Sequence, residues 1–481
     1  MNSKSESLTS NFSWKFAERI TAQLVTLVVS IILARLLDPT DYGVIAIVTI
    51  FITLANVFVS DGFGSALIQK KNSDALDFSS VLYFNILFSI FLYLILFFVA
   101  PLISSFYGEG YEILVPVMRV IGLRLVISGV NSVQHAYVSK KMIFRKFFWS
   151  TLIGTVVSAI VGIYMAYTGF GVWALVGQYL TNTFIDTIVL SISIHRMPLF
   201  AFSFKRLKKL FGFGAKVLGT NILITSYVEL RAILIGKVYS SADLAYYNKG
   251  EQFPKLIITN VNVSVSSVLF PRMSNMQYDK FAVKSIARKS IRVCSYLMCP
   301  LMLGMLIVAE PFVRLVLTEK WLQCVPYLQL FCIIYLFYPI HSTNMQVIKA
   351  MGRGNTYLIL ETVKKVIELI VLLIVVWISV KWIVLSTAIL TTLFTFINAF
   401  PNRKIINYSF KEQIVDILPA LIMSTIMIIV VYVVSLINLP LVISFLLQIF
   451  IGAIIYLTLS IVTKNKEMKF LIDKIKRVLR K

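Results

Sequence analysis

The sequence is poor in charge and in the residues from which metal and disulfide sites are built. Asp, Glu, Lys and Arg make up only 14% of its 481 residues, and there are four cysteines and three histidines. The cysteines all fall inside apolar segments, which favours buried small hydrophobes over disulfides or zinc ligands, and the histidines have no partners at metal-binding spacing. We therefore expect no metal and no cofactor. These residues are Cys294, Cys299, Cys324, Cys332, His135, His195 and His341.

Long polar segments are also absent. No interval between apolar segments has room for a separate soluble domain, and no nucleophile has a base positioned beside it. A polysaccharide polymerase, ligase or glycosyltransferase would need a long external loop or an acidic metal-nucleotide motif, so we expect no enzymatic activity. The first apolar segment is too long for a removable signal peptide and lacks a small-residue cleavage site.

Apolar residues dominate instead, at 58% of the chain with a mean hydropathy of +0.85. They form about fourteen blocks, and a bilayer core about 30 Å thick needs roughly 20 apolar residues per helix. The sequence predicts an all-α integral membrane protein with about 14 transmembrane helices. We place these at about residues 12–37, 42–68, 79–102, 112–138, 147–168, 172–194, 210–238, 247–271, 290–316, 323–348, 356–379, 383–400, 413–437 and 441–462.

Basic residues are concentrated in every second interval between these blocks. Lys140 and Lys141 lie in one such interval, whereas the alternate intervals hold mainly acids such as Asp41 and Glu109. By the positive-inside rule, the basic intervals and both termini face the cytoplasm. The net charge of +24 is then a topology signal that also meets anionic lipid, and we expect no nucleic-acid partner.

The C-terminal tail, residues 464–481, has the spacing of an amphipathic helix. Its lysines lie opposite an apolar face, which is typical of a helix on the inner leaflet. A plain solvated end is the alternative interpretation. The apolar face consists of Met468, Leu471, Ile472, Ile475 and Leu479.

An internal repeat appears when the chain is shifted by 202 positions. The shift aligns residues 32–37 with 234–239, and it places Arg35 on Lys237. Because the copies are offset by an even number of helices, they share one orientation, as parallel repeats about an axis along the membrane normal do. Two six-helix lobes around a central cavity would suit alternating access, and chance similarity between two hairpins is the other explanation.

This repeat divides the chain into four parts. They are an N-lobe at residues 1–209, a C-lobe at 210–405, an extra helix pair at 406–463 and the basic tail at 464–481.

Two segments near the start also carry a family resemblance. Residues 31–43 (IILARLLDPTDYG) and 61–71 (DGFGSALIQKK) resemble the opening of Wzx-type bacterial polysaccharide flippases, particularly the colanic acid exporter branch. Residues 169–176 (GFGVWALV) and 269–273 (LFPRM) are similar to later patterns of that family. The resemblance extends to about residue 400, and the last two helices carry little of it.

The resemblance implies the fold of the multidrug/oligosaccharidyl-lipid/polysaccharide (MOP) superfamily. It implies a flippase that moves undecaprenyl-pyrophosphate-linked oligosaccharide across the bacterial inner membrane, next to membrane lipids and the polysaccharide polymerase machinery. The extra helix pair would lie outside the lobes, where it is a candidate for binding the lipid tail. A MATE-like small-molecule cation antiporter is the alternative, although such a protein is expected to have an acidic cavity and usually twelve helices.

Charged residues inside the apolar blocks are the candidate cargo site. Each costs about 2.5–3.5 kcal/mol at helix depth unless it faces a cavity or a partner. Arginine suits a pyrophosphate because its planar fork donates two parallel hydrogen bonds and stays charged. Internal ion pairing is the alternative, and we favour it for the Glu361 to Glu368 cluster. The substrate-binding candidates are Arg19, Arg35, Arg119, Arg124, Lys216 and Arg231.

Acidic residues in the blocks are candidates for ion coupling. Burial raises the pKa of a membrane carboxylate toward neutrality, which suits a proton or cation site. Anchoring of a helix end is the other role we consider, for Asp61 in particular. The candidates are Asp61, Asp186, Glu229 and Glu251.

Overall fold

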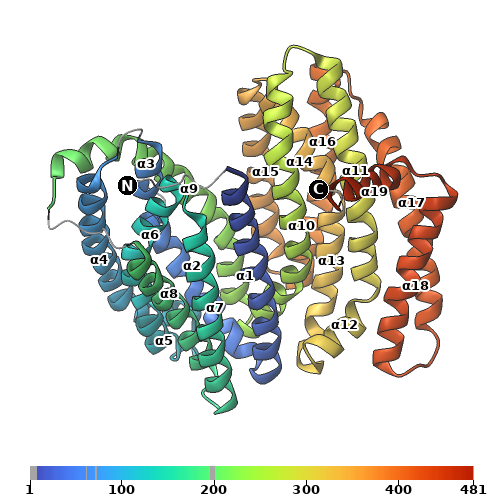
Figure 1. The fold of residues 1–481 in the computed structure, drawn as a ribbon. Helices are drawn as coiled ribbons and strands as arrows, with labels where there is room; N and C mark the ends of the chain where they lie inside the picture. Colours follow the sequence, from blue (N-terminus) through green and yellow to red (C-terminus); the bar gives the residue numbers. More distant parts are fainter. Residues whose placement is uncertain (1–7, 61, 71–72, 195–200, 480–481) are drawn as a thin grey trace. The chain divides into compact units, whose positions relative to one another are not determined.

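The computed structural model describes residues 8–60, 62–70, 73–194 and 201–479, and within these ranges every regular element is a helix. Eleven helices of the described chain are long and apolar enough to cross a membrane. The predicted all-α membrane fold is therefore confirmed. The chain forms two compact units, Met1–Ala245 and Tyr246–Lys481 (Figure 1).

The first unit is built around three groups of packed helices. Helix α7 packs against both α1 and α8, α6 packs against α2, α4 and α8, and α9 packs against α2, α3 and α4. By these contacts α9 belongs to the first unit, whereas the predicted lobe boundaries stay a prediction. The helices are α1 (Leu8–Leu36), α2 (Pro39–Ser60), α3 (Gly62–Gln69), α4 (Ala75–Tyr107), α5 (Leu114–Ile121), α6 (Leu123–Lys141), α7 (Phe144–Tyr167), α8 (Val172–Ile194) and α9 (Phe204–Val238), followed by the start of α10 (Ser241–Asn275).

In the second unit, α11 packs against α13, α14 and α17, and α18 packs against α17. Figure 1 shows α17 and α18, in orange-red, side by side at one edge of this unit. The helices after α10 are α11 (Lys280–Ile307), α12 (Ala309–Val316), the 3-10 helix η1 (Glu319–Cys324), α13 (Val325–Leu336), α14 (Tyr338–Ala350), α15 (Gly354–Val375), α16 (Val380–Ile406), α17 (Phe410–Ser435), α18 (Leu441–Val462) and α19 (Lys466–Leu479).

Each predicted helix coincides with one observed helix or with a consecutive pair. Three of the fourteen predicted segments, those at α8, α10 and α15, are not among the eleven candidate spans. Helix α15 is less apolar because it carries four charged side chains, from Glu361 to Glu368, within about two turns. The count of 14 therefore stays a prediction.

The two halves of the sequence repeat the same order of elements. Each has an acidic residue in the first turn of its second long helix, Asp41 in α2 and Asp243 in α10. Each also has a pair of helices separated by a single residue, after Ile121 in the first half and after Leu336 in the second. This order agrees with an internal repeat, and the superposition of two lobes stays a prediction.

Gly43, within the segment that carries the family resemblance, allows α2 to approach the start of α10. A Cβ atom at this position would lie 1.9 Å from the backbone oxygen of Ser241. Only glycine fits so close to another backbone, because any side chain would collide with it. The glycine is thus required by packing within the first unit.

The tail forms the predicted helix, α19, and two residues of its apolar face contact the rest of the second unit. Met468 and Leu471 pack against a buried cluster of α11, α17 and α18 that includes Tyr296, Met423 and Tyr456. A plain solvated end does not account for this contact, whereas an orientation of the helix along the inner leaflet stays a prediction. The apolar residues attach α19 to the second unit because they bury more surface there than in solvent.

The start of α4 is held by a cluster of charges. Asp74 caps the helix by accepting a hydrogen bond from the backbone N–H of Asp77, and Arg206 Nη1 lies 2.8 Å from Asp74 Oδ2. Lys70 Nζ lies 2.6 Å from the buried carboxylate of Asp77. The backbone hydrogen bond, followed by Arg206, holds the pKa of Asp74 below its ordinary value of 3.8.

We expect Asp74→Ala to destabilise the protein by about 1 kcal/mol at neutral pH, because the helix loses its N-cap. A carboxylate whose pKa is lowered in the folded state stabilises the fold at pH values above its ordinary pKa. This contribution to stability is lost as the pH falls through the lowered pKa. In detergent, the variant should therefore unfold at a lower temperature than the unaltered protein at neutral pH, and this difference should become smaller in acid. Glu109→Ala removes an exposed carboxylate from a turn of the same unit, and an equal deficit in this control would contradict the cap.

Candidate functional site

Arg124 lies at the start of α6 and reaches α8. Its Nε donates to Thr183 Oγ1 at 2.9 Å, and its guanidinium carbon lies 5.5 Å from the ring centroid of Tyr179. Arg124 is half-buried, and no carboxylate in the described ranges forms an ion pair with it. A cation held by a hydroxyl and a ring face keeps its charge available for an anion.

Asp186 occupies the same interface between α6 and α8. Its carboxylate accepts a hydrogen bond from Asn131 Nδ2 at 2.8 Å, and His135 Nε2 lies 3.1 Å from the same oxygen. Further along the interface, Gln134 Nε2 donates to Ser191 Oγ at 2.6 Å. The face of α6 toward α8 is therefore polar along several turns. Of the sequence candidates, Arg124 and Asp186 are brought to this one interface.

A polar hollow of about 310 Å³ opens beside this interface. It is formed by α2, α3 and α6, and the two partners of Asp186, Asn131 and His135, are in its wall. Sequence reasoning missed this hollow because its lining is mostly serine and asparagine, which carry no charge signal. The lining residues are Asn56, Ser60, Gly64, Ser65, Ile68, Ser128, Asn131, Ser132, His135, Ala136 and Ser139.

The other cation candidates do not join this interface through any described bond. Arg119 turns toward α4, where its Nε donates to the Phe97 oxygen at 3.3 Å and its guanidinium covers the Phe97 ring at 4.2 Å. Arg35 is exposed at the end of α1, Arg19 is half-buried in α1, and Arg231 is half-buried in α9. These residues stay predictions as cargo ligands.

The remaining acidic candidates are dispersed. Glu229 is half-buried in α9 of the first unit, and Glu251 lies in α10 within the second. Glu251 accepts a hydrogen bond from Tyr335 at 2.8 Å and pairs with Lys255 at 3.1 Å. Asp61 lies outside the described residues, as does the side chain of Lys216.

The charges of α15 pair with each other. Lys364 Nζ lies 2.5 Å from Glu361 Oε1, and Lys365 Nζ lies 2.9 Å from Glu368 Oε2. The internal ion pairing favoured from the sequence is confirmed for this cluster. These pairs offset part of the cost of placing four charges on an otherwise apolar helix.

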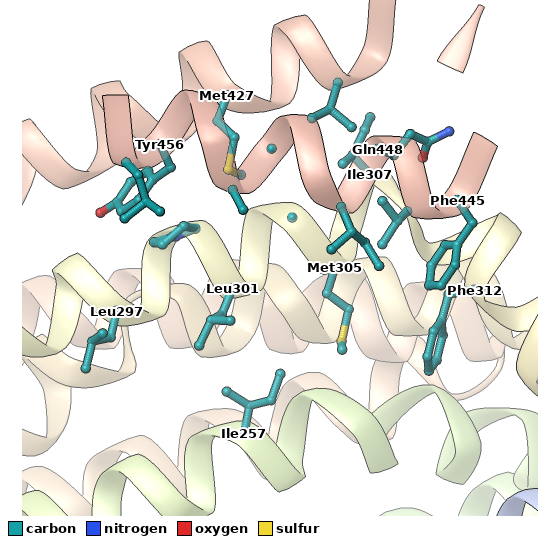
Figure 2. A pocket seen from close by; sticks show the side chains of 18 of the residues that line it. Ile257, Leu297, Leu301, Met305, Ile307, Phe312, Met427, Phe445, Gln448 and Tyr456 are labelled. Atoms are coloured by element: carbon teal, nitrogen blue, oxygen red, sulfur yellow. The ribbon is translucent and has the colours of Figure 1, made fainter. Parts of the chain in front are cut away.

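The second unit holds an apolar groove of about 590 Å³. Figure 2 shows Leu297, Leu301 and Met305 of α11 on one side of it, with Met427 and Tyr456 of α17 and α18 opposite. Leu297 and Leu301 are 38% and 47% exposed, so the groove has an open wall of hydrocarbon side chains. The lining also includes the amide of the buried residue Gln448. Its one described hydrogen bond is donated to Ser444 Oγ, one helical turn away, at 3.0 Å.

Helix pair α17–α18 had been a candidate for lipid-tail binding, but the sequence did not identify the residues. The groove is completed by α10 and α12, through Ile257 and Phe312, and the Phe312 ring lies 6.3 Å from that of Phe445 in α18 (Figure 2). Hydropathy could not have found it, since lipid-facing, buried and groove-lining leucines look alike in a sequence.

The chain is similar to known proteins over most of its length. The sequence model of the family described as "Polysaccharide biosynthesis protein" matches residues 32–326. The teichuronic acid biosynthesis protein TuaB of Bacillus subtilis is 23% identical over 360 residues, which are 74% of each chain. The lipopolysaccharide biosynthesis protein WzxC of Escherichia coli is 24% identical over 358 residues, covering 72% of this chain and 71% of WzxC.

Among solved structures, the lipid II flippase MurJ in an inward closed conformation superposes with a TM-score of 0.76. The match covers 94% of this chain and 99% of that one at 19% identity, so it establishes the fold. The family match spans more than half of the sequence and agrees with the resemblance of residues 31–43. The chain belongs to the family of polysaccharide biosynthesis proteins.

Proposed function

We propose that the protein translocates a lipid-linked oligosaccharide, carried on undecaprenyl pyrophosphate, across the bacterial inner membrane by alternating access. The cargo would be a unit for O-antigen, capsule or exopolysaccharide. Transport, with no change of covalent bonds, is the proposed activity. The positive-inside pattern supports an orientation with both termini in the cytoplasm. The expected recipient of the cargo is the polysaccharide polymerase machinery.

The apolar groove of the second unit is the observation that carries this proposal. An isoprenoid chain needs a long hydrocarbon surface, and the groove offers one along α11, α17 and α18. Burying apolar area contributes about 25 cal/mol per Å², so even partial occupancy by a polyprenyl chain stabilises the complex. A small polar cation gains little from such a surface, and the groove therefore favours a lipid-linked cargo over a drug cation.

The first unit supports the polar part of the same cargo. Arg124 presents a guanidinium whose described partners are a hydroxyl and an aromatic ring, and the hollow beside α6 is lined by hydroxyls and amides. Arginine binds phosphate oxygens through charge-assisted hydrogen bonds, and hydroxyls and amides suit sugars. A drug-cation antiporter is expected to have an acidic cavity, whereas Arg124 supplies a positive charge at this interface.

The test is to delete the gene and to follow the lipid-linked intermediates. We expect undecaprenyl-pyrophosphate oligosaccharide to accumulate on the cytoplasmic leaflet, surface polysaccharide to disappear, and resistance to cationic drugs to stay unchanged. Re-expression of the full chain should reverse both defects. Normal polysaccharide together with raised drug sensitivity would instead support the antiporter.

A further inference from the structure

One end of the second unit brings together the starts of α11 and α17 and the end of α18. Lys284, near the start of α11, pairs with Glu412 in the first turn of α17 at 2.7 Å. Tyr296 of α11 donates to Ser460, near the end of α18, at 2.9 Å. Tyr278 and Phe281, at the start of α11, are 94% and 81% exposed, as aromatic residues of a membrane interface are.

A single carboxylate at this end is shared by two arginines. Arg288 donates to both oxygens of Asp416 at 2.8 Å, and Arg292 Nε donates to Asp416 Oδ1 at 2.8 Å. The Asp416 side chain is fully buried, whereas each arginine side chain is 35% exposed. One carboxylate balances one arginine, so one positive charge remains in excess.

The donors of this pair exceed the acceptors that surround them. Two guanidiniums offer ten N–H groups, and all four of their described hydrogen bonds are donated to Asp416. Neither arginine forms another described hydrogen bond to the protein. The remaining donors suit the several oxygens of a phosphate, which Arg binds in pairs.

Lys289 of α11 and Lys464, which precedes α19, add to the positive charge. Lys289 is exposed, and its Nζ lies 3.7 Å above the ring of Phe470 in α19, without a described ion pair. Around the shared carboxylate, cations outnumber acids by six to three. The cations are Lys284, Arg288, Lys289, Arg292, Lys464 and Lys466, and the acids are Glu412, Asp416 and Glu467.

Two adjoining hollows at this end differ in character. One, of about 390 Å³, is lined by the basic face of α11, and the other, of about 630 Å³, runs along α17; both include Arg292 and Glu467. The second has a polar mouth at residues 463–467 and an apolar wall. That wall consists of Tyr296, Val415, Leu418, Pro419, Ala420, Ile422 and Met423. A basic hollow that continues into an apolar one fits an amphiphile with an anionic head.

We propose that this end of the second unit binds a phospholipid with an anionic headgroup. The phosphate contacts Arg288, Arg292 and Lys289, and an acyl chain lies along the apolar wall of α17. Basic hollows between helices at the membrane surface bind such headgroups. Tyr296 lines both this site and the apolar groove, whereas Arg288, Lys289 and Arg292 line only this site. The ligand is an ordinary membrane lipid, so the test does not depend on the proposed cargo.

The test measures lipid binding by the purified full chain in detergent, by native mass spectrometry and by thermal unfolding. The probes are phosphatidylglycerol, phosphatidylcholine with the same acyl chains, and inorganic phosphate. We expect phosphatidylglycerol to be retained and to raise the unfolding midpoint, with little effect from the other two probes. A shift produced equally by phosphatidylcholine, or wholly by inorganic phosphate, would overturn the proposal.

Variants locate the site. Arg292→Gln combined with Lys289→Gln should weaken phosphatidylglycerol binding about tenfold or more, since charge-assisted hydrogen bonds are lost. Lys289→Gln alone, at an exposed position, should weaken it by a smaller factor without perturbing the fold. Lys404→Gln, which removes an exposed cation of α16 outside both hollows, should leave binding unchanged. Equal binding by Lys289→Gln, the double variant and the control would overturn the proposal.

Discussion

Arg124→Gln is expected to reduce surface polysaccharide by about tenfold or more while the protein stays at its normal level in the membrane. The substitution removes the charge that would bind the pyrophosphate, and a charge-assisted hydrogen bond is worth enough to change binding by that factor. Glutamine can still bond to Thr183, so the α6–α8 interface should be kept. The measurement is surface polysaccharide per cell, with protein quantified in isolated membranes.

Two further variants separate charge from packing. Arg124→Lys should restore export only partly, because lysine keeps the charge but not the planar fork. Arg145→Gln removes an exposed arginine that also covers an aromatic ring, at 5.6 Å from the Trp14 centroid, and should export normally. Unchanged export by Arg124→Gln would remove this residue from the cargo site.

Filling the apolar groove at Gly304 is expected to abolish export. Gly304 lines the groove from α11, and a Cβ there would meet only the end of Met427, at 3.7 Å. Gly304→Phe therefore places a ring where the lipid chain would lie, without a backbone collision. Surface polysaccharide should fall to the background of the deletion strain, and lipid-linked oligosaccharide should accumulate.

The matched control is Gly304→Ala. A methyl group at 3.7 Å is in ordinary van der Waals contact, and alanine favours the helix by about 0.5–1 kcal/mol over glycine. This variant should export normally and unfold at the same temperature or slightly higher. Full export by Gly304→Phe, with the protein folded, would contradict a role for the groove in transport.

The site candidates show where charge patterns in the sequence are informative. Glu361 to Glu368 occupy one face of one helix, and spacing alone predicted their pairing, since partners three residues apart meet on a helix. Arg124 has no acidic neighbour in the sequence, and the structure gives it none among the described residues. His135 was dismissed for lack of a nearby carboxylate, yet Asp186 reaches it from a different helix.

The sequence by itself determined the helical membrane class, the approximate position of each helix, the repeated order of elements and the family. These depend on local hydropathy, helix length and short motifs. Each of these features is encoded within a single segment and does not depend on contacts with other segments. Only the tertiary structure decided which apolar residues line the groove, that Met468 and Leu471 attach α19 to the bundle, and that Asp416 is shared by two arginines. The groove is formed by leucines and methionines that the sequence cannot distinguish from buried ones, and the other two contacts join residues of different helices. Such pairings follow from helix packing.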